Sequence, residues 1–110
     1  IPIFDGGNGE GELESALGVA LPFIGRRQRH GNVLVHCAAG MSRSVSVIAA
    51  VLCADGEAVE AAFDHIARAK AEAFVTPVDD PDMLIAPAWE FRSCLSRLYA
   101  RSKNNSTLAR

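Results

Sequence analysis

The chain has 110 residues, of which 49% are hydrophobic and 22% are charged, so an intrinsically disordered class is excluded and one globular domain is expected. The formal net charge of −2 gives no support for nucleic-acid binding, and no apolar run is long enough to predict a transmembrane helix. Three cysteines, an odd number at wide spacing, argue against a disulfide scaffold and favour a reducing, cytoplasmic location.

The first third of the chain predicts an extended piece, a helix and a strand. Residues 1–4 are apolar and extended, and a glycine-rich loop follows at 5–11. Over residues 12–24 apolar side chains recur at helical spacing, although Pro22 should kink this helix at a cost of about 3 kcal/mol. The apolar run at 33–35 then predicts a buried strand.

The remainder of the chain is predicted to be mostly helical. Residues 45–53 are apolar almost all round, as in a central helix, and a second helix follows from about residue 57. Residues 76–87 are rich in proline and aspartate and predict an irregular segment before a last helix. Residues 102–110 are polar and predict a flexible tail. The order of strands and helices predicts an α/β fold with parallel pairing.

Residues 36–44, with the sequence His-Cys-Ala-Ala-Gly-Met-Ser-Arg-Ser, lie between the predicted strand and the predicted central helix. A strand, a tight loop and a helix N-terminus together form an anion site, because N–H groups of the loop and first helical turn lack internal partners and can converge on a phosphate. The residues expected to bind a substrate phosphate are Ala38, Ala39, Gly40, Met41, Ser42 and Arg43.

Four side chains in this stretch carry chemistry suited to phosphate esters. Cys37 can act as a nucleophile, because nearby N–H groups and a helix N-terminus lower a thiol pKa. Arg43 offers a planar fork that binds two phosphate oxygens at once. Ser44 could donate a hydrogen bond to the Cys37 sulfur and help the thiolate to leave. His36 is expected to orient the loop through hydrogen bonds.

A general acid for the leaving oxygen must come from outside this stretch. Asp5 is the candidate, since it lies at the end of the extended piece in a glycine-rich loop that could close over a site.

The spacing His36-Cys37-x2-Gly40-x2-Arg43-Ser44 resembles the signature of the cysteine-dependent protein tyrosine phosphatases, and its flanks are most similar to the dual-specificity branch. The resemblance implies a phosphatase that acts on phosphotyrosine, and also on phosphoserine and phosphothreonine, in proteins. It implies a phosphocysteine intermediate at Cys37, Asp5 as general acid, Arg43 as phosphate clamp and Ser44 as partner of the leaving thiolate. No metal or other cofactor, no nucleic acid and no membrane is implied as a partner.

The resemblance also implies a phosphatase-type parallel sheet, here partial, with a central strand, phosphate loop and helix surrounded by helices. It is close over residues 1–68, and we expect a catalytic domain over residues 1–101. The family has further strands before the acid loop, and this chain begins too late to contain them. We therefore expect an N-terminally truncated domain in which the strand at 33–35 exposes its edges.

Two other kinds of function stay open from the sequence. The chain could bind phosphate or a phosphoprotein without turning it over. It could also be another Cys-x5-Arg enzyme, such as an arsenate reductase or a sulfurtransferase, which would require a second redox cysteine. Cys53 and Cys94 are expected to be core thiols instead.

Overall fold

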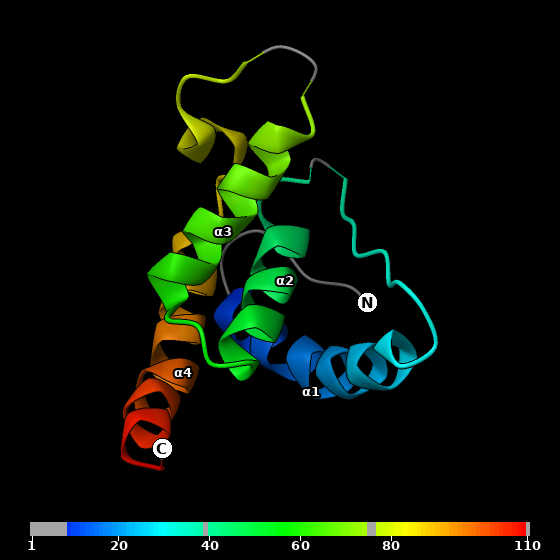
Figure 1. The fold of residues 1–110 in the computed structure, drawn as a ribbon. Coiled ribbons are helices and arrows are strands. Elements are labelled where there is room, and N and C mark those ends of the chain that lie inside the picture. The colour runs from blue at the N-terminus through cyan, green and yellow to red at the C-terminus, as the bar shows by residue number, and fades with distance from the viewer. Residues whose placement is uncertain (1–8, 39, 75–76, 110) are drawn as a thin grey trace.

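The structure is a computed structural model, and it describes residues 9–38, 40–74 and 77–109. Within these described residues, five helical elements follow one another (Figure 1). They are α1 (Gly9–Gln28), α2 (Arg43–Ala54), α3 (Val59–Glu72), the 3₁₀ helix η1 (Pro81–Leu84) and α4 (Trp89–Ala109). The prediction of a flexible tail at 102–110 stays a prediction.

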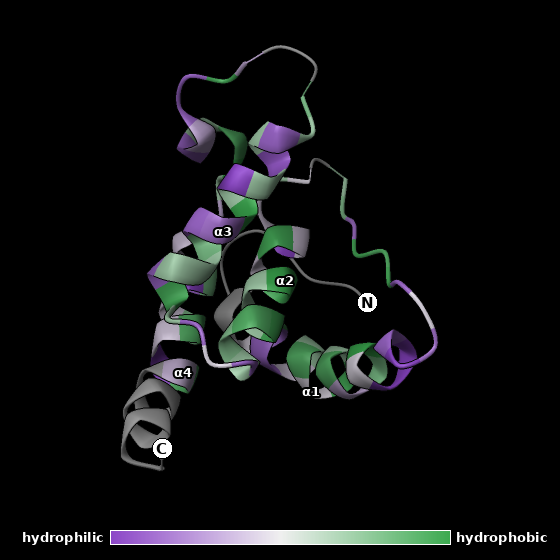
Figure 2. Ribbon diagram, viewed as in Figure 1, coloured by the Kyte–Doolittle hydropathy of each residue, from purple (hydrophilic) through white to green (hydrophobic). Residues whose placement is uncertain are grey.

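Helix α2 is the central helix of the fold: it contacts α1, α3 and α4, and most of its residues are buried. Its sequence explains this position: the helix is apolar on nearly every side, and both Ala49 and Ala50 are completely buried. The hydropathy colouring shows α2 as mostly apolar, whereas hydrophilic residues are more frequent in α3 and in the coloured part of α4 (Figure 2). The site described below lies at the N-terminal end of this central helix.

Each surrounding helix buries one apolar stripe in the shared core. On α1 the stripe consists of Leu13, Ala16, Leu17, Ala20 and Ile24, all of which are buried. Pro22 lies inside α1 and its side chain is exposed, so the apolar stripe continues past it. Phe63 of α3 and Phe91 of α4 are the largest fully buried side chains of the core.

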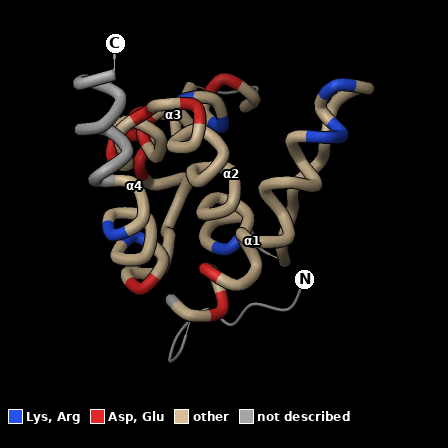
Figure 3. The backbone as a smooth tube through the Cα atoms, turned by 90° about the horizontal axis from the view of Figure 1, so that it is seen from below, with Lys and Arg blue, Asp and Glu red and all other residues tan. Residues whose placement is uncertain are grey.

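Ion pairs on the surface connect the helices. The Arg97 guanidinium donates to the Glu14 carboxylate at 2.9 Å and joins α4 to α1. Arg92 on α4 donates to Glu60 on α3 at 3.0 Å. Both pairs are solvent-exposed, so each contributes at most about 1 kcal/mol. The charge distribution also shows basic residues gathered at the C-terminal end of α1, where they complement the helix dipole (Figure 3).

The predicted α/β fold with a parallel sheet is wrong for the part of the chain that is described, which contains helices and no strand. Residues 32–37 form an irregular segment between α1 and the loop. Their exposure still alternates: Val33 and Val35 are half-buried, whereas Leu34 is 84% exposed. This alternation is typical of a strand, but a ladder needs a second, paired strand, and none is formed among the described residues. The predicted extended piece at 1–4 lies outside the described residues.

Candidate active site

One glycine just before α2 has a backbone conformation suited to the turn that leads into this helix. Gly40 has a φ of 70°, in the left-handed region that side chains with a Cβ disfavour. No heavy atom lies within 4 Å of the position that a Cβ would occupy on Gly40. Glycine is therefore required here for its conformation and not for lack of space.

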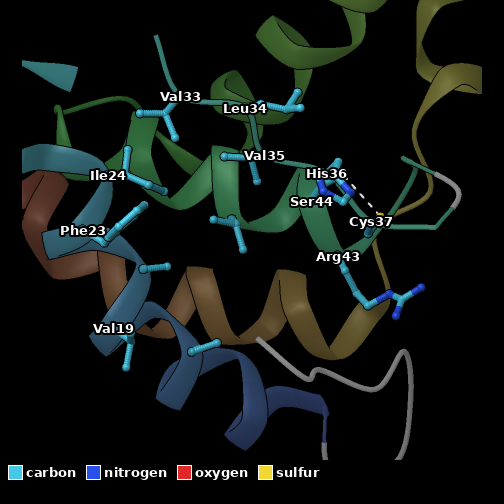
Figure 4. A pocket seen from close by; sticks show the side chains of 13 residues that line it. Val19, Phe23, Ile24, Val33, Leu34, Val35, His36, Cys37, Arg43 and Ser44 are labelled. Atoms are coloured by element: carbon cyan, nitrogen blue, oxygen red, sulfur yellow. Dashed lines mark hydrogen bonds between the residues drawn. The ribbon is translucent and has the colours of Figure 1, made fainter. Parts of the chain in front are cut away.

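The Cys37 sulfur is surrounded by hydrogen-bond donors. The Ser44 hydroxyl lies 3.3 Å from the sulfur (Figure 4). The Gly40 N–H donates to the same sulfur at 3.3 Å. Burial alone would raise the pKa of the Cys37 thiol. The Ser44 hydroxyl and the backbone N–H groups of Ser44, Gly40 and Ser42 outweigh this effect and lower the pKa to about 6. Cys37 is therefore largely ionised at neutral pH.

The other two cysteines have a different environment. Cys53 is buried in the core, and burial together with the charge of Glu57 raises the pKa of its thiol to about 11. Cys94 is completely buried on α4. Among the three thiols, the geometry favours Cys37 alone as a nucleophile.

Three serines support the loop from the helix side, and all are buried. The Ser46 hydroxyl donates to the Ser42 carbonyl at 2.7 Å, one turn back along the helix. The Ser42 hydroxyl makes no cap on α2 and instead accepts the N–H of Ala88 at 2.9 Å. Only Ser44 turns its hydroxyl toward the Cys37 sulfur. The sequence predicts the Ser44 contact but gives no indication of the roles of Ser42 and Ser46.

A pocket of about 520 Å³ extends from Cys37 along the gap between α1 and residues 33–37. Val19, Phe23 and Ile24 of α1 line it on one side, facing the irregular segment on the other (Figure 4). At the Cys37 end the polar lining comes from Arg43 and Ser44. The pocket thus joins a polar end that carries the nucleophile to a long apolar wall.

The structure brings part of the predicted set of site residues together. Arg43 is the first residue of α2 and lines the same pocket as Cys37 and the exposed His36. The clamping role of Arg43 and the orienting role of His36 stay predictions. Asp5, the predicted acid, and Ala39, one of the phosphate-binding residues, lie outside the described residues.

The outer edge of the loop is held by residues that sequence reasoning missed. Lys70 of α3 donates to the Gly40 carbonyl at 2.8 Å and to the Leu84 carbonyl at 2.7 Å. The Ala86 N–H donates to the Met41 carbonyl at 2.7 Å. One signal was available in the sequence: Lys70 continues the apolar stripe of α3, and a lysine at such a position needs a polar partner.

Comparison with known families decides the assignment. The model for the dual specificity phosphatase catalytic domain matches residues 1–80, which include the whole loop and its nucleophile. The chain belongs to the dual specificity phosphatase family. Members of this family are protein phosphatases, so the chain belongs to the hydrolases. No curated protein and no solved structure matches the chain.

The described part of this dual specificity phosphatase contains no helix that is both long and apolar enough to span a membrane.

Proposed function

We propose that this dual specificity phosphatase hydrolyses phosphotyrosine, and also phosphoserine and phosphothreonine, in protein substrates through a covalent phosphocysteine at Cys37. The observation that carries the proposal is the environment of the Cys37 sulfur, with the Ser44 hydroxyl and the Gly40 N–H each at 3.3 Å and a pKa of about 6. Such a thiolate is a nucleophile at neutral pH without help from a metal.

In the first step the Cys37 thiolate attacks phosphorus, a P–S bond forms and the P–O bond to the substrate breaks. Arg43 and the N–H groups of the loop bind the equatorial oxygens, where negative charge gathers. Asp5 gives its proton to the leaving oxygen. In the second step water attacks phosphorus and gives a proton to the Asp5 carboxylate left by the first step, and the P–S bond breaks. Ser44 donates to the departing thiolate, and its hydroxyl at 3.3 Å from the sulfur supports that role.

The polar end of the pocket supports a phosphate as the recognised group, because Arg43 and Ser44 line it beside the nucleophile. A thiolate of low pKa is sensitive to oxidation, so we also propose a reducing, cytoplasmic location.

The test is hydrolysis of p-nitrophenyl phosphate by the wild-type chain and by the Cys37→Ser variant. We expect activity that persists in EDTA, is blocked by vanadate and is abolished by the substitution. A Cys53→Ser variant serves as the matched control, because Cys53 is buried away from the loop and should leave the rate unchanged. Activity that survives Cys37→Ser contradicts the mechanism. Phosphate binding without any release of product would favour a binding module instead.

A further inference from the structure

Lys70 joins three separate parts of the chain. It lies in the last turn of α3, is half-buried, and directs its ammonium group to two carbonyl oxygens. One belongs to Gly40 in the loop at 2.8 Å, and the other to Leu84 at the end of η1 at 2.7 Å. Hydrogen bonds from a charged donor are stronger than neutral ones, so this bridge ties the loop firmly to α3 and η1.

The segment that follows η1 extends the same support along the loop. Leu84 shares Lys70 with Gly40, the N–H of Ala86 donates to the Met41 carbonyl, and the N–H of Ala88 donates to the Ser42 hydroxyl. Gly40, Met41 and Ser42 are therefore each anchored by α3 or by the segment that follows η1. We call these contacts the outer brace of the loop.

Because the peptide bond is planar, the contacts of the outer brace also fix the direction in which the N–H groups of the loop point. In a trans peptide the C=O and the following N–H point in opposite directions. When Lys70 holds the Gly40 carbonyl outward, the Met41 N–H must point to the opposite side of the loop. In the same way the Met41 carbonyl, held by Ala86, turns the Ser42 N–H inward. This N–H is one of the groups that lower the pKa of the Cys37 thiol.

We propose that Lys70 is a positioning residue of this phosphatase, which orients the Gly40–Met41 peptide so that the loop presents its N–H groups to the substrate phosphate. Lys70 acts through the backbone and does not touch the reacting atoms. The inference rests on the proposed function only in that the bound group is a phosphate.

The test compares Lys70→Met with Lys70→Arg and with Arg68→Met. Methionine keeps much of the apolar stem but removes the donors, whereas arginine restores them. Arg68 is the matched control, because it is a basic residue on the same helix whose guanidinium donates to Asp64 at 2.9 Å and stays exposed. Two quantities are measured in each variant: the affinity for inorganic phosphate, by isothermal titration, and the pKa of Cys37, from the pH dependence of alkylation by iodoacetamide.

We expect Lys70→Met to weaken phosphate binding about tenfold and to raise the Cys37 pKa by about half a unit to one unit, because the donors are no longer held in place. Lys70→Arg should recover most of both effects, and Arg68→Met should show neither. A Cys37 pKa and a phosphate affinity in Lys70→Met equal to those of Arg68→Met would overturn the proposal, even if both variants lost thermal stability.

The measurements separate this inference from the proposed function. Neither requires turnover, so a wild-type chain that releases no product would refute the phosphatase mechanism and still leave the role of Lys70 to be decided by the Cys37 pKa. Circular dichroism checks that Lys70→Met folds. If it does not, Lys70→Gln, which keeps an N–H donor for one of the two carbonyls, should show an intermediate rise in the pKa. No rise in that variant would again overturn the proposal.

Discussion

Replacing Ser44 with alanine should weaken the nucleophile without removing it. The Ser44 hydroxyl lies 3.3 Å from the Cys37 sulfur and is the largest of the influences that lower the Cys37 pKa to about 6. A hydrogen bond to a charged group contributes about 1.5–3 kcal/mol, and the lower end applies because Cys37 is only half-buried. Since one pKa unit corresponds to about 1.4 kcal/mol, we expect the Ser44→Ala variant to have a Cys37 pKa of about 7.

The consequence is a pH-dependent loss of reactivity. At pH 6 the wild-type thiol is about half ionised, whereas a thiol with a pKa of 7 is about one-eleventh ionised, so the alkylation rate should fall about fivefold. Above pH 8 the two rates should converge. The acidic limb of kcat/KM should move upward by the same unit.

The control for this prediction is Ser46→Ala, which removes another buried hydroxyl of α2 that bonds to the Ser42 carbonyl and not to the sulfur. The control should keep the wild-type pKa. If Ser44→Ala and Ser46→Ala give the same Cys37 pKa, the assigned role of the Ser44 hydroxyl is wrong.

Two further substitutions test other parts of the site. Asp5→Ala should lower kcat on p-nitrophenyl phosphate by about 10²–10⁴-fold while leaving phosphate affinity unchanged, as expected for a lost general acid, and an unaltered kcat would remove Asp5 from that role. Gly40→Ala should lower the free energy of unfolding by about 1–2 kcal/mol, because Gly40 has a φ of 70°. By contrast, Gly18→Ala within α1 should raise it by about 0.5–1 kcal/mol, and thermal unfolding of both variants measures the difference. Equal shifts would contradict the conformational argument for Gly40.

The local parts of the site could be predicted from the sequence because they depend on neighbours in the chain. Cys37, Gly40 and Ser44 lie within eight residues, and the order of loop and helix brings the Ser44 hydroxyl to the Cys37 sulfur. The apolar stretch after Arg43 predicts the central helix for the same reason. Family membership follows from this short stretch, and the match over residues 1–80 confirms it.

The parts that could not be predicted depend on distant segments. The apolar run at 33–35 predicts a buried strand, but Leu34 is 84% exposed, Val33 and Val35 are only half-buried, and no strand forms there, since pairing depends on a partner segment. Pro22 predicts a kinked helix, yet its exposed position lets the stripe of α1 continue past it. The partners of Lys70 lie 30 and 14 residues away in sequence, and no local pattern specifies a contact of that range.

The hydrogen bonds around the N-terminus of α2 also make the stability of the first helical turn depend on the charge of Cys37. The Ser42 hydroxyl accepts the Ala88 N–H and does not cap α2. The N–H groups of Ser42 and Ser44 are hydrogen-bonded to the Cys37 sulfur instead. The thiolate thus occupies the place of an N-cap. Its pKa is below that of an unfolded thiol, so this stabilisation is present at high pH and is lost as the pH falls through about 6. The rate of amide hydrogen exchange in the first turn of α2 should therefore rise as Cys37 is protonated.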